Sequence, residues 1–447
     1  MILGAREAGR AATSSGRVAL VRGHALLAAI FILWVPAPPA PWASPGAPRP
    51  WPEGTEALPF ENLEGMVLLT ATARGYGERD TTGLFILDTG AGSLALDSEL
   101  ARMLGVAGVA SGDRAVRLAD RPLPRFTIGA WSLDHLSPVL TIEADPLRRA
   151  TDRPVLGLVG QGLLRDRVLW LDYHEQLVAL IPASNDAPAS EAVRRSRHAL
   201  AGRLSPHAAA VPFRLAADGK VLVRAKVAGP TGKRAGVTLI VDTGSSKCVL
   251  FEEALGRWKG VADWPALRGL IAPTLLGTGT AWLTRVTLDL PAASVPVTRR
   301  GLDAAVVSSP LGPLLSRAVG ESVDGLLGYS FLKRFNVAVD YPRRILWLDP
   351  LPDYRDDRPF EYSHVGLQIE RRGGQATVAA VADRSPAALA GICPGDEIVL
   401  VDGASVDTMD TIRLARRMEG RPGSAIELRI RRGDTERTYH IRRRRLL

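Results

Sequence analysis

The chain has 447 residues, of which 46% are hydrophobic and 23% are charged. It is therefore long enough for two or three domains and has the composition of a globular protein, which argues against a disordered or fibrous one. Its formal net charge of +9 is concentrated at the two ends, since residues 1–50 carry +4 and residues 421–447 carry +6. The near-neutral region between them argues against a basic groove for nucleic acid.

The N-terminal segment has the layout of a targeting sequence. An apolar run over residues 25–35 follows four arginines and is ended by Pro36. Eleven residues form about 16 Å of helix, which is short for a stable membrane span. We therefore expect residues 1–40 to be a signal peptide or a short N-terminal anchor, and residues 41–57 to be a Pro-rich linker. The protein is then exported, periplasmic or extracellular, with a membrane-anchored form if the signal is not cleaved.

The middle of the chain contains an internal repeat. An apolar run ends in Asp88-Thr-Gly, and a second run ends in Asp242-Thr-Gly 154 residues later. Short apolar runs separated by Gly and Pro turns predict strands, so each copy is expected to be an all-β lobe. The first lobe is predicted over residues 58–181 and the second over 209–350, with 182–208 as a polar linker.

Each lobe also carries a later apolar segment that contains glycines. These segments begin at Gly157 and Gly325, an offset of 168. The offset indicates that the second lobe has about 14 more residues between its Asp-Thr-Gly and this segment. The same two landmarks thus recur in the same order in both lobes.

The paired Asp-Thr-Gly tripeptides point to proton-transfer chemistry. A single copy is more often a plain turn, but two copies in register with a long repeat predict that Asp88 and Asp242 meet where the lobes pair. Two carboxyl groups about 3 Å apart cannot both ionise, so they share a proton and titrate together. Such a pair can act as acid and as base.

These motifs resemble the retropepsin-like aspartic proteases, with both lobes in one chain. The resemblance covers about residues 58–350 and implies an all-β bilobal acid-protease fold made of two homologous β-barrel-like lobes. It implies that Asp88 and Asp242 are catalytic. It further implies a group of residues that support the active-site loops: Thr89, Gly90, Thr243, Gly244 and Ser246. The first loop departs from the pattern, because Gly92 stands where many members have Ser or Thr.

The C-terminal part resembles a PDZ domain of the bacterial type. Three sequence blocks, at 364–369, 385–391 and 394–403, occur in the order that such domains show. We expect a small α+β domain over residues 361–445 after a charged connector, 351–360. The resemblance places Gly366 and Leu367 on the loop that takes a peptide by its C-terminal end.

The sequence thus predicts an aspartic-type endopeptidase, a hydrolase in which the carboxyl pair activates a water against a peptide bond. The PDZ domain would bind a peptide or regulate access. An alternative is a non-catalytic peptide-binding scaffold with a degenerate protease fold, and a third reading is a protease that cuts its own 182–208 segment. No cofactor, metal or nucleic acid is expected. The expected partners are a peptide or unfolded protein substrate and a C-terminal peptide ligand of the PDZ domain, and the protein is expected to be a monomer.

Overall fold

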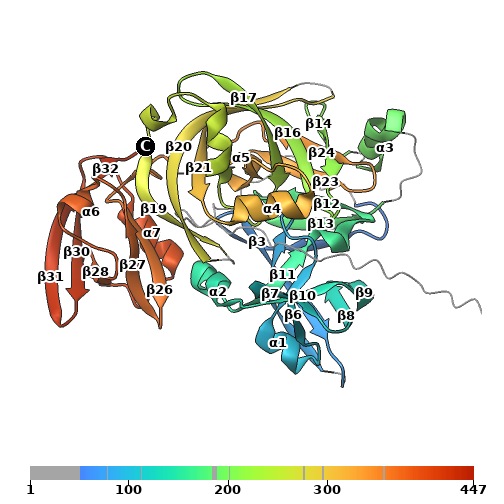
Figure 1. Cartoon of the computed structure of the whole chain (residues 1–447), viewed down its shortest axis with the longest axis horizontal. Helices are drawn as coiled ribbons and strands as arrows, with labels where there is room; N and C mark the ends of the chain where they lie inside the picture. The colour runs from blue at the N-terminus through green and yellow to red at the C-terminus, as the bar shows by residue number, and fades with distance from the viewer. Residues whose placement is uncertain are drawn as a thin grey trace, which may run out of the picture.

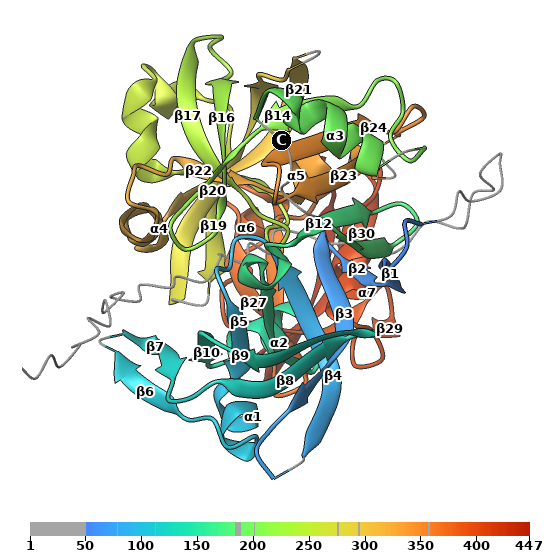
Figure 2. The same ribbon diagram turned by 90° about the vertical axis from the view of Figure 1, so that its right-hand side faces the viewer.

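The structure is a computed structural model that describes residues 51–447 apart from 78, 112, 184–188, 201, 275–276, 294–295 and 356–357. It consists of two β-rich lobes that pack against each other and a smaller C-terminal domain at their side (Figures 1 and 2). The expected signal peptide or anchor, 1–40, and most of the expected linker 41–57 lie outside the described residues. No helix in the described part of the chain combines the length and the apolar character that a membrane span needs.

Lobe 1 is built on one ten-stranded sheet. Its strands in spatial order are β6 (Gly108–Ser111), β7 (Asp113–Ala119), β10 (Val139–Ile142), β5 (Leu94–Asp97), β11 (Val155–Gly160), β4 (Asp80–Asp88), β3 (Met66–Arg74), β8 (Leu123–Ile128) and β9 (Trp131–Leu136), with β2 (Glu61–Leu63) on β3. Three short helices complete it: α1 (Ser98–Met103), α2 (Asp145–Thr151) and η1 (Gln161–Leu164). The repeat's second landmark is β11, which runs parallel to β4.

Lobe 2 is an eight-stranded sheet that closes on itself, because β16 pairs with both β17 and β20. In spatial order the strands are β15 (Arg214–Leu215), β16 (Val221–Ala228), β17 (Arg234–Val241), β22 (Gly325–Leu327), β18 (Cys248–Phe251), β21 (Val297–Ser308), β20 (Gly277–Leu290) and β19 (Leu267–Thr274). Its helices are η3 (Glu252–Arg257), η4 (Val261–Asp263), α4 (Leu311–Val319) and α5 (Tyr329–Leu332). Here β22 lies parallel to β17, as β11 does to β4.

The two lobes share a third sheet of six strands. Its order is β1 (Glu56–Pro59), β13 (Leu177–Pro182), β12 (Arg167–Asp172), β23 (Phe335–Asp340), β24 (Ile345–Pro350) and β14 (Ala209–Pro212). At its centre β12 of lobe 1 pairs antiparallel with β23 of lobe 2, with Trp170 opposite Ala338. One hydrophobic cluster extends through both lobes, so they form a single folded body.

The 182–208 segment is more than the polar linker that its composition indicates. It contains η2 (Ala189–Glu191) and the helix α3 (Ala192–Ala199), which packs on the shared sheet. Ser196 is fully buried; its hydroxyl donates to Asp340 Oδ2 at 2.6 Å and accepts from Trp347 Nε1 at 2.8 Å. This helix is therefore part of the folded body.

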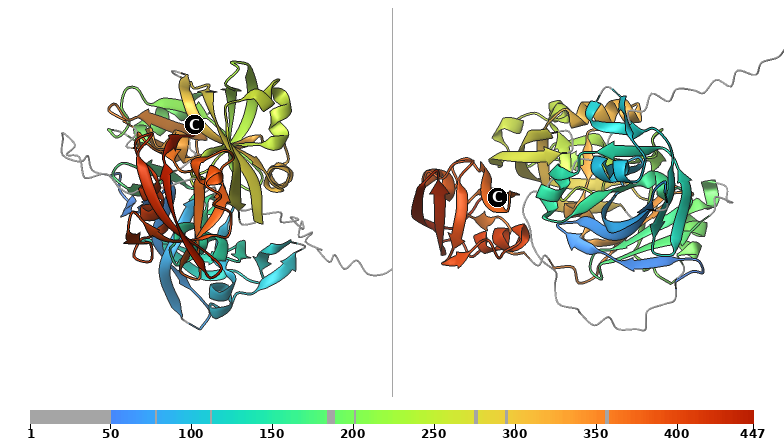
Figure 3. Two further views of the ribbon diagram at one scale, coloured as in Figure 1. Left: turned by 90° about the vertical axis from the view of Figure 1, so that its left-hand side faces the viewer. Right: turned by 90° about the horizontal axis from the view of Figure 1, so that it is seen from below.

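The C-terminal domain has its own hydrophobic cluster. Its main sheet contains β26 (Leu367–Arg372), β27 (Gln375–Val381), β28 (Glu397–Val401), β30 (Ala425–Arg432) and β31 (Thr435–Arg442), with β29 (Ala404–Ser405) beside β28. A short pair, β25 (Ser363–His364) and β32 (Arg444–Arg445), closes it, and its helices are α6 (Pro386–Leu389) and α7 (Thr411–Met418). Figure 3 shows this domain projecting from one side of the two lobes.

Candidate functional site

Asp88 and Asp242 end two strands that occupy equivalent places in the two lobes. Asp88 is the last residue of β4, and Asp242 follows β17 directly. Each lies beside the parallel strand that carries the later glycine segment: Gly160 is opposite Asp88, and the amide of Asp242 donates to Leu327 O at 3.1 Å. Both aspartates are fully buried. The structure therefore brings together the two residues that the repeat singled out.

Two threonines lock the loops together across the lobe interface. The Thr89 hydroxyl donates to Val241 O at 2.8 Å, and the Thr243 hydroxyl donates to Leu87 O at 2.7 Å. Each hydroxyl also accepts the amide of the other threonine at 3.1 Å. These four reciprocal hydrogen bonds fix the position of one Asp-bearing loop against the other.

The glycines of the tripeptides allow the carboxyl groups to meet. The Gly90 amide donates to Asp88 Oδ1, and the Gly244 amide donates to Asp242 Oδ1, both at 2.8 Å. A Cβ atom added at Gly244 would lie 2.8 Å from Asp88 Cγ, so only glycine leaves room for the opposite carboxyl. The two carboxyl groups lie close enough for each to act on the pKa of the other.

Burial makes this pair retain protons. It raises the pKa of Asp88 to about 6, against the lowering effects of the Asp242 side chain and of the Gly90 amide. The pKa of Asp242 lies well above its usual value because of burial and then of the nearby negative charge of Asp88. Burial therefore favours the protonated form of both carboxyls, so the pair can hold a shared proton and can both give and take one.

The raised pKa values predict a pH dependence of stability. The folded state holds more protons than the unfolded state above pH ~4, so the free energy of unfolding falls as pH rises through Asp88's value of about 6. We expect Asp88→Asn to remove a slope on the order of 1 kcal/mol per pH unit over this range and so to gain stability relative to wild type at neutral pH. Urea unfolding at pH 4, 5, 6 and 7 measures this. Parallel pH profiles of the two proteins would contradict it.

The remaining loop residues differ between the lobes. Ser246 is buried, and no described residue is a hydrogen-bond partner of its hydroxyl. The corresponding position of lobe 1 is Gly92, where an added Cβ would lie 2.9 Å from Asp218 O. Like the Ser246 hydroxyl, the Oδ2 atoms of Asp88 and Asp242 have no hydrogen-bond partner among the described residues. A bound ligand or water is what ordinarily satisfies such buried polar atoms.

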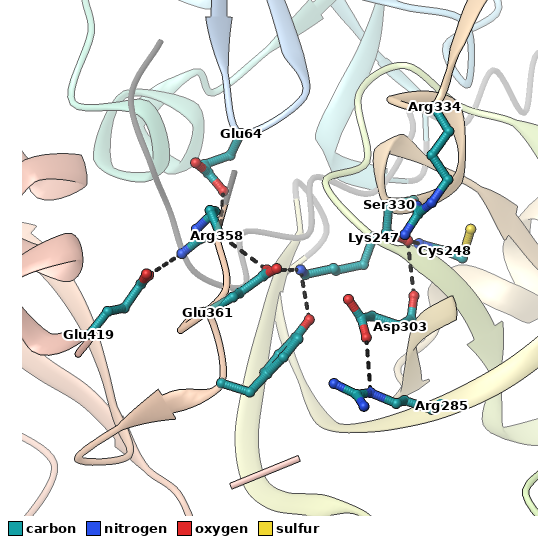
Figure 4. A network of polar contacts seen from close by, with 11 residues as sticks. Glu64, Lys247, Cys248, Arg285, Asp303, Ser330, Arg334, Arg358, Glu361 and Glu419 are labelled. Carbon is teal, nitrogen blue, oxygen red and sulfur yellow. Dashed lines mark hydrogen bonds and ion pairs between the residues drawn. The ribbon is translucent and has the colours of Figure 1, made fainter. Parts of the chain in front are cut away.

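A buried ionic network, which the sequence analysis missed, adjoins the second loop (Figure 4). Lys247, five residues after Asp242, donates to Glu361 Oε1 at 2.5 Å and to the Tyr362 hydroxyl at 3.0 Å. Burial raises the pKa of Glu361, but the charges of Lys247 and Arg358 outweigh this and lower it to about 2. The connector 351–360, predicted as a charged linker, therefore contributes to the core of the junction.

Arg358 is the centre of this network. Its guanidinium lies 3.1 Å from Glu361 and 3.7 Å from Glu64 of lobe 1, and it pairs with Glu419 of the C-terminal domain. Only 7% of its side chain is exposed. The network thus ties both lobes and the C-terminal domain to the loop that carries Asp242.

The predicted peptide loop of the C-terminal domain is tightly packed. Gly366 has φ +92°, and a Cβ added there would lie 2.2 Å from Ser385 Cβ, so glycine is required. Its amide donates to His364 Nδ1 at 2.9 Å, and Leu367 is fully buried. In this structure the Gly366 amide is therefore already used within the domain.

The edge strand that follows this loop lies against the lobes. The Gln368 side chain accepts the amide of Ile271 at 2.8 Å and donates to its carbonyl at 3.1 Å. The amide of Asp383 donates to Arg268 O at 2.9 Å, and α2 of lobe 1 packs beside β26. A peptide adding to this edge would have to share it with β19 and α2.

Nothing in the described part of the chain suggests a metal site, since no group of three or more His, Cys, Asp or Glu side chains there is arranged to hold an ion. The candidate site therefore consists of the buried carboxyl pair, Asp88 and Asp242.

Comparison with known proteins places a PDZ domain at residues 377–432. A curated relative, the "Probable CtpA-like serine protease" of Staphylococcus haemolyticus (strain JCSC1435), is 27% identical over 95 residues, or 21% of this chain and 19% of the relative. A Staphylococcus saprophyticus protein of the same name is 26% identical over 104 residues. The chain spans about a fifth of the length of these curated relatives.

Two solved structures are also similar to parts of the chain. The photosystem II D1 C-terminal processing protease is 30% identical, with a TM-score of 0.19, over 19% of this chain and 24% of that one. The aspartic proteinase from Irpex lacteus is 12% identical, with a TM-score of 0.39, over 67% of this chain and 98% of that one.

These names correct the sequence analysis on the class of enzyme. The curated relatives are named as serine proteases, so the assignment to the aspartic-type endopeptidases, and with it the aspartyl and retropepsin-like activity, is wrong by this comparison. The C-terminal PDZ domain is confirmed. The chain as described is predominantly β, as expected.

Proposed function

We propose that this protein is a PDZ-containing protease that acts on peptides or unfolded polypeptide chains. The observation that carries the proposal is the meeting of Asp88 and Asp242 in one buried site, where burial raises the pKa of both carboxyls. The protease names of the relatives and the PDZ match at 377–432 support it.

The arrangement of the lobes supports the choice of this site. Two copies of one β pattern, joined through a shared sheet and through the reciprocal threonine bonds, resemble the paired lobes of the retropepsin-like fold. We therefore propose Asp88 and Asp242 as the residues that exchange protons with the bound polypeptide. Thr89, Gly90, Thr243 and Gly244 hold them in place, and Ser246 offers a free hydroxyl beside the second loop.

The PDZ domain is proposed to bind the polypeptide by its C-terminal end and to control access to the lobes. Its edge strand β26 is engaged by Ile271 of β19, so binding of a peptide at this edge and release from β19 are coupled. The N-terminal segment adds the proposal that the protein acts outside the cytoplasm, where unfolded exported chains are the available substrates.

The test is hydrolysis of a denatured protein substrate by the full chain between pH 4 and 8, followed by mass spectrometry of the fragments. We expect wild type to produce fragments and Asp88→Asn or Asp242→Asn to slow their appearance by at least ~10²-fold, the usual effect of losing a proton-transfer group. Asp80→Asn is the matched control, because Asp80 lies on the same strand but pairs with Arg74 at the surface.

Two results would overturn the proposal. A wild-type protein that cleaves nothing at any pH would remove the protease function. Activity that survives Asp88→Asn but is blocked by a serine-directed fluorophosphonate would place the reaction at a serine, as the names of the relatives indicate.

A further inference from the structure

A buried lysine from lobe 2 lies against the loop that carries Asp88. Lys220 directly precedes β16 and is fully buried. A Cβ added at Gly92 would lie 3.8 Å from Lys220 Nζ, so the ammonium occupies space beside the first loop. Its ion-pair partner is Asp218, in the same turn. The first loop therefore receives a positive charge from the opposite lobe.

Comparison of the two copies of the repeat shows that lobe 2 carries this positive charge and that lobe 1 does not. In lobe 1, Leu68 pairs with Ile86, two residues before Asp88; in lobe 2, the equivalent Leu222 pairs with Ile240, two residues before Asp242, and Lys220 stands two residues before Leu222. The residue of lobe 1 that corresponds to Lys220 is thus Met66, which is also buried. Both lobes have an acidic residue two positions before this site, Glu64 in lobe 1 and Asp218 in lobe 2. Only lobe 2 has the lysine.

The two Asp-bearing loops also differ in one side chain. The second loop has the hydroxyl of Ser246, while the first has Gly92 and no side chain at that position. The lysine stands beside the loop that lacks the hydroxyl. The lysine therefore supplies positive charge on the side of the pair whose loop lacks the hydroxyl.

The groups that act on the pair can be named element by element. Lys220 is the cation that lowers the pKa of both aspartates, and Asp218 partly neutralises it. The buried phenols of Tyr173 and Tyr341, which directly follow β12 and β23, lie within electrostatic reach of Asp242 and Asp88 respectively. The loop amides of Gly90 and Gly244 complete the set.

We propose that Lys220 is a positioning residue of the carboxyl pair: its buried ammonium, beside the loop that carries Asp88, stabilises the negative charge of the singly protonated pair. This inference rests on the proposed function of the pair. A charge of this kind keeps the pair singly protonated at lower pH than two buried carboxyls alone would allow.

The test is a titration of the pair that does not depend on activity. In the full chain with ¹³C-labelled aspartate carboxyls, Asp88→Asn and Asp242→Asn identify the two resonances, and their pH dependence is compared between wild type and Lys220→Met. Met66 shows that methionine fits the equivalent position. We expect both apparent pKa values of the pair to rise by about one pH unit, because the removed charge favoured ionisation. Lys226→Met, an exposed residue of β16, should leave them unchanged.

A second variant covers the case in which Lys220→Met does not fold. Asp218→Asn keeps the ammonium and removes its counter-charge, so the same resonances should shift to lower pH. Unchanged titration in either folded variant would overturn the role of Lys220. The expected shifts together with a wild type that cleaves nothing would sustain that role and remove the proposed function. Where hydrolysis is observed, its acid limb should move upward with the Lys220→Met titration.

Discussion

Arg358→Met should lower the free energy of unfolding by about 3 to 5 kcal/mol at pH 7. Arg358 is nearly fully buried and faces three carboxylates, Glu64, Glu361 and Glu419, from three parts of the chain. Removing one partner of a buried ion network leaves the others without compensation, and this costs far more than the network itself contributes. Chemical denaturation of the full chain, followed by tryptophan fluorescence, measures the change.

The pH dependence of this loss identifies its cause. Burial raises the pKa of both Glu64 and Glu419, so these carboxyls take up protons readily once Arg358 is absent. The loss should therefore shrink as pH falls toward 5. Arg355→Met is the control, because Arg355 lies in the same connector but is exposed. An equally small effect of both substitutions would mean that the network does not hold the junction.

The sequence predicted the aspartate pair because the pattern that encodes it is local and occurs twice. Asp88-Thr-Gly and Asp242-Thr-Gly each follow an apolar run, and a repeat of this length can be detected by comparing the chain with itself. The structure places both residues at equivalent strand ends. The strands of the two lobes and the C-terminal PDZ domain could be predicted for the same reason. Alternating apolar runs and ordered motif blocks are local signals.

The 182–208 segment was misread because its composition is polar. Its helix α3 depends on Ser196, whose partners Asp340 and Trp347 are 144 and 151 residues away. No local pattern encodes such a pairing. The shared sheet is hidden in the same way, because β12 and β23 each look like an ordinary strand of their own lobe.

The charged groups around the pair were missed for a related reason. Lys220 and Lys247 are single lysines in apolar surroundings, and a lone lysine is normally exposed. Lys247 has its partner Glu361 114 residues later, at the first residue of the predicted C-terminal domain. A signal did exist for one of them, because only a few lysines occur in the chain and Lys247 stands five residues after Asp242. The enzyme class was misassigned because the motif was read without the evidence of relatives.

Thr89→Val and Thr243→Val should each lower the free energy of unfolding by about 2 to 4 kcal/mol. Each hydroxyl donates to a carbonyl of the opposite loop and accepts the other threonine's amide. Valine has the same shape but leaves one buried carbonyl and one buried amide unpaired, at about 1 to 3 kcal/mol for each. Denaturant unfolding of the full chain measures both losses, and Thr72→Val, which removes only a hydroxyl pair at the surface, is the control.

The double variant separates this network from two independent contacts. The two substitutions remove different hydrogen bonds, but both sets of bonds hold the same two loops together. Loosening of the loops by the first substitution therefore weakens the bonds that the second would remove. The loss in Thr89→Val/Thr243→Val should therefore be smaller than the sum of the single losses by at least ~0.5 kcal/mol. A strictly additive double variant would show that the loops are held by other contacts. A coupled one would show that the position of Asp88 relative to Asp242 depends on the interlocked pair.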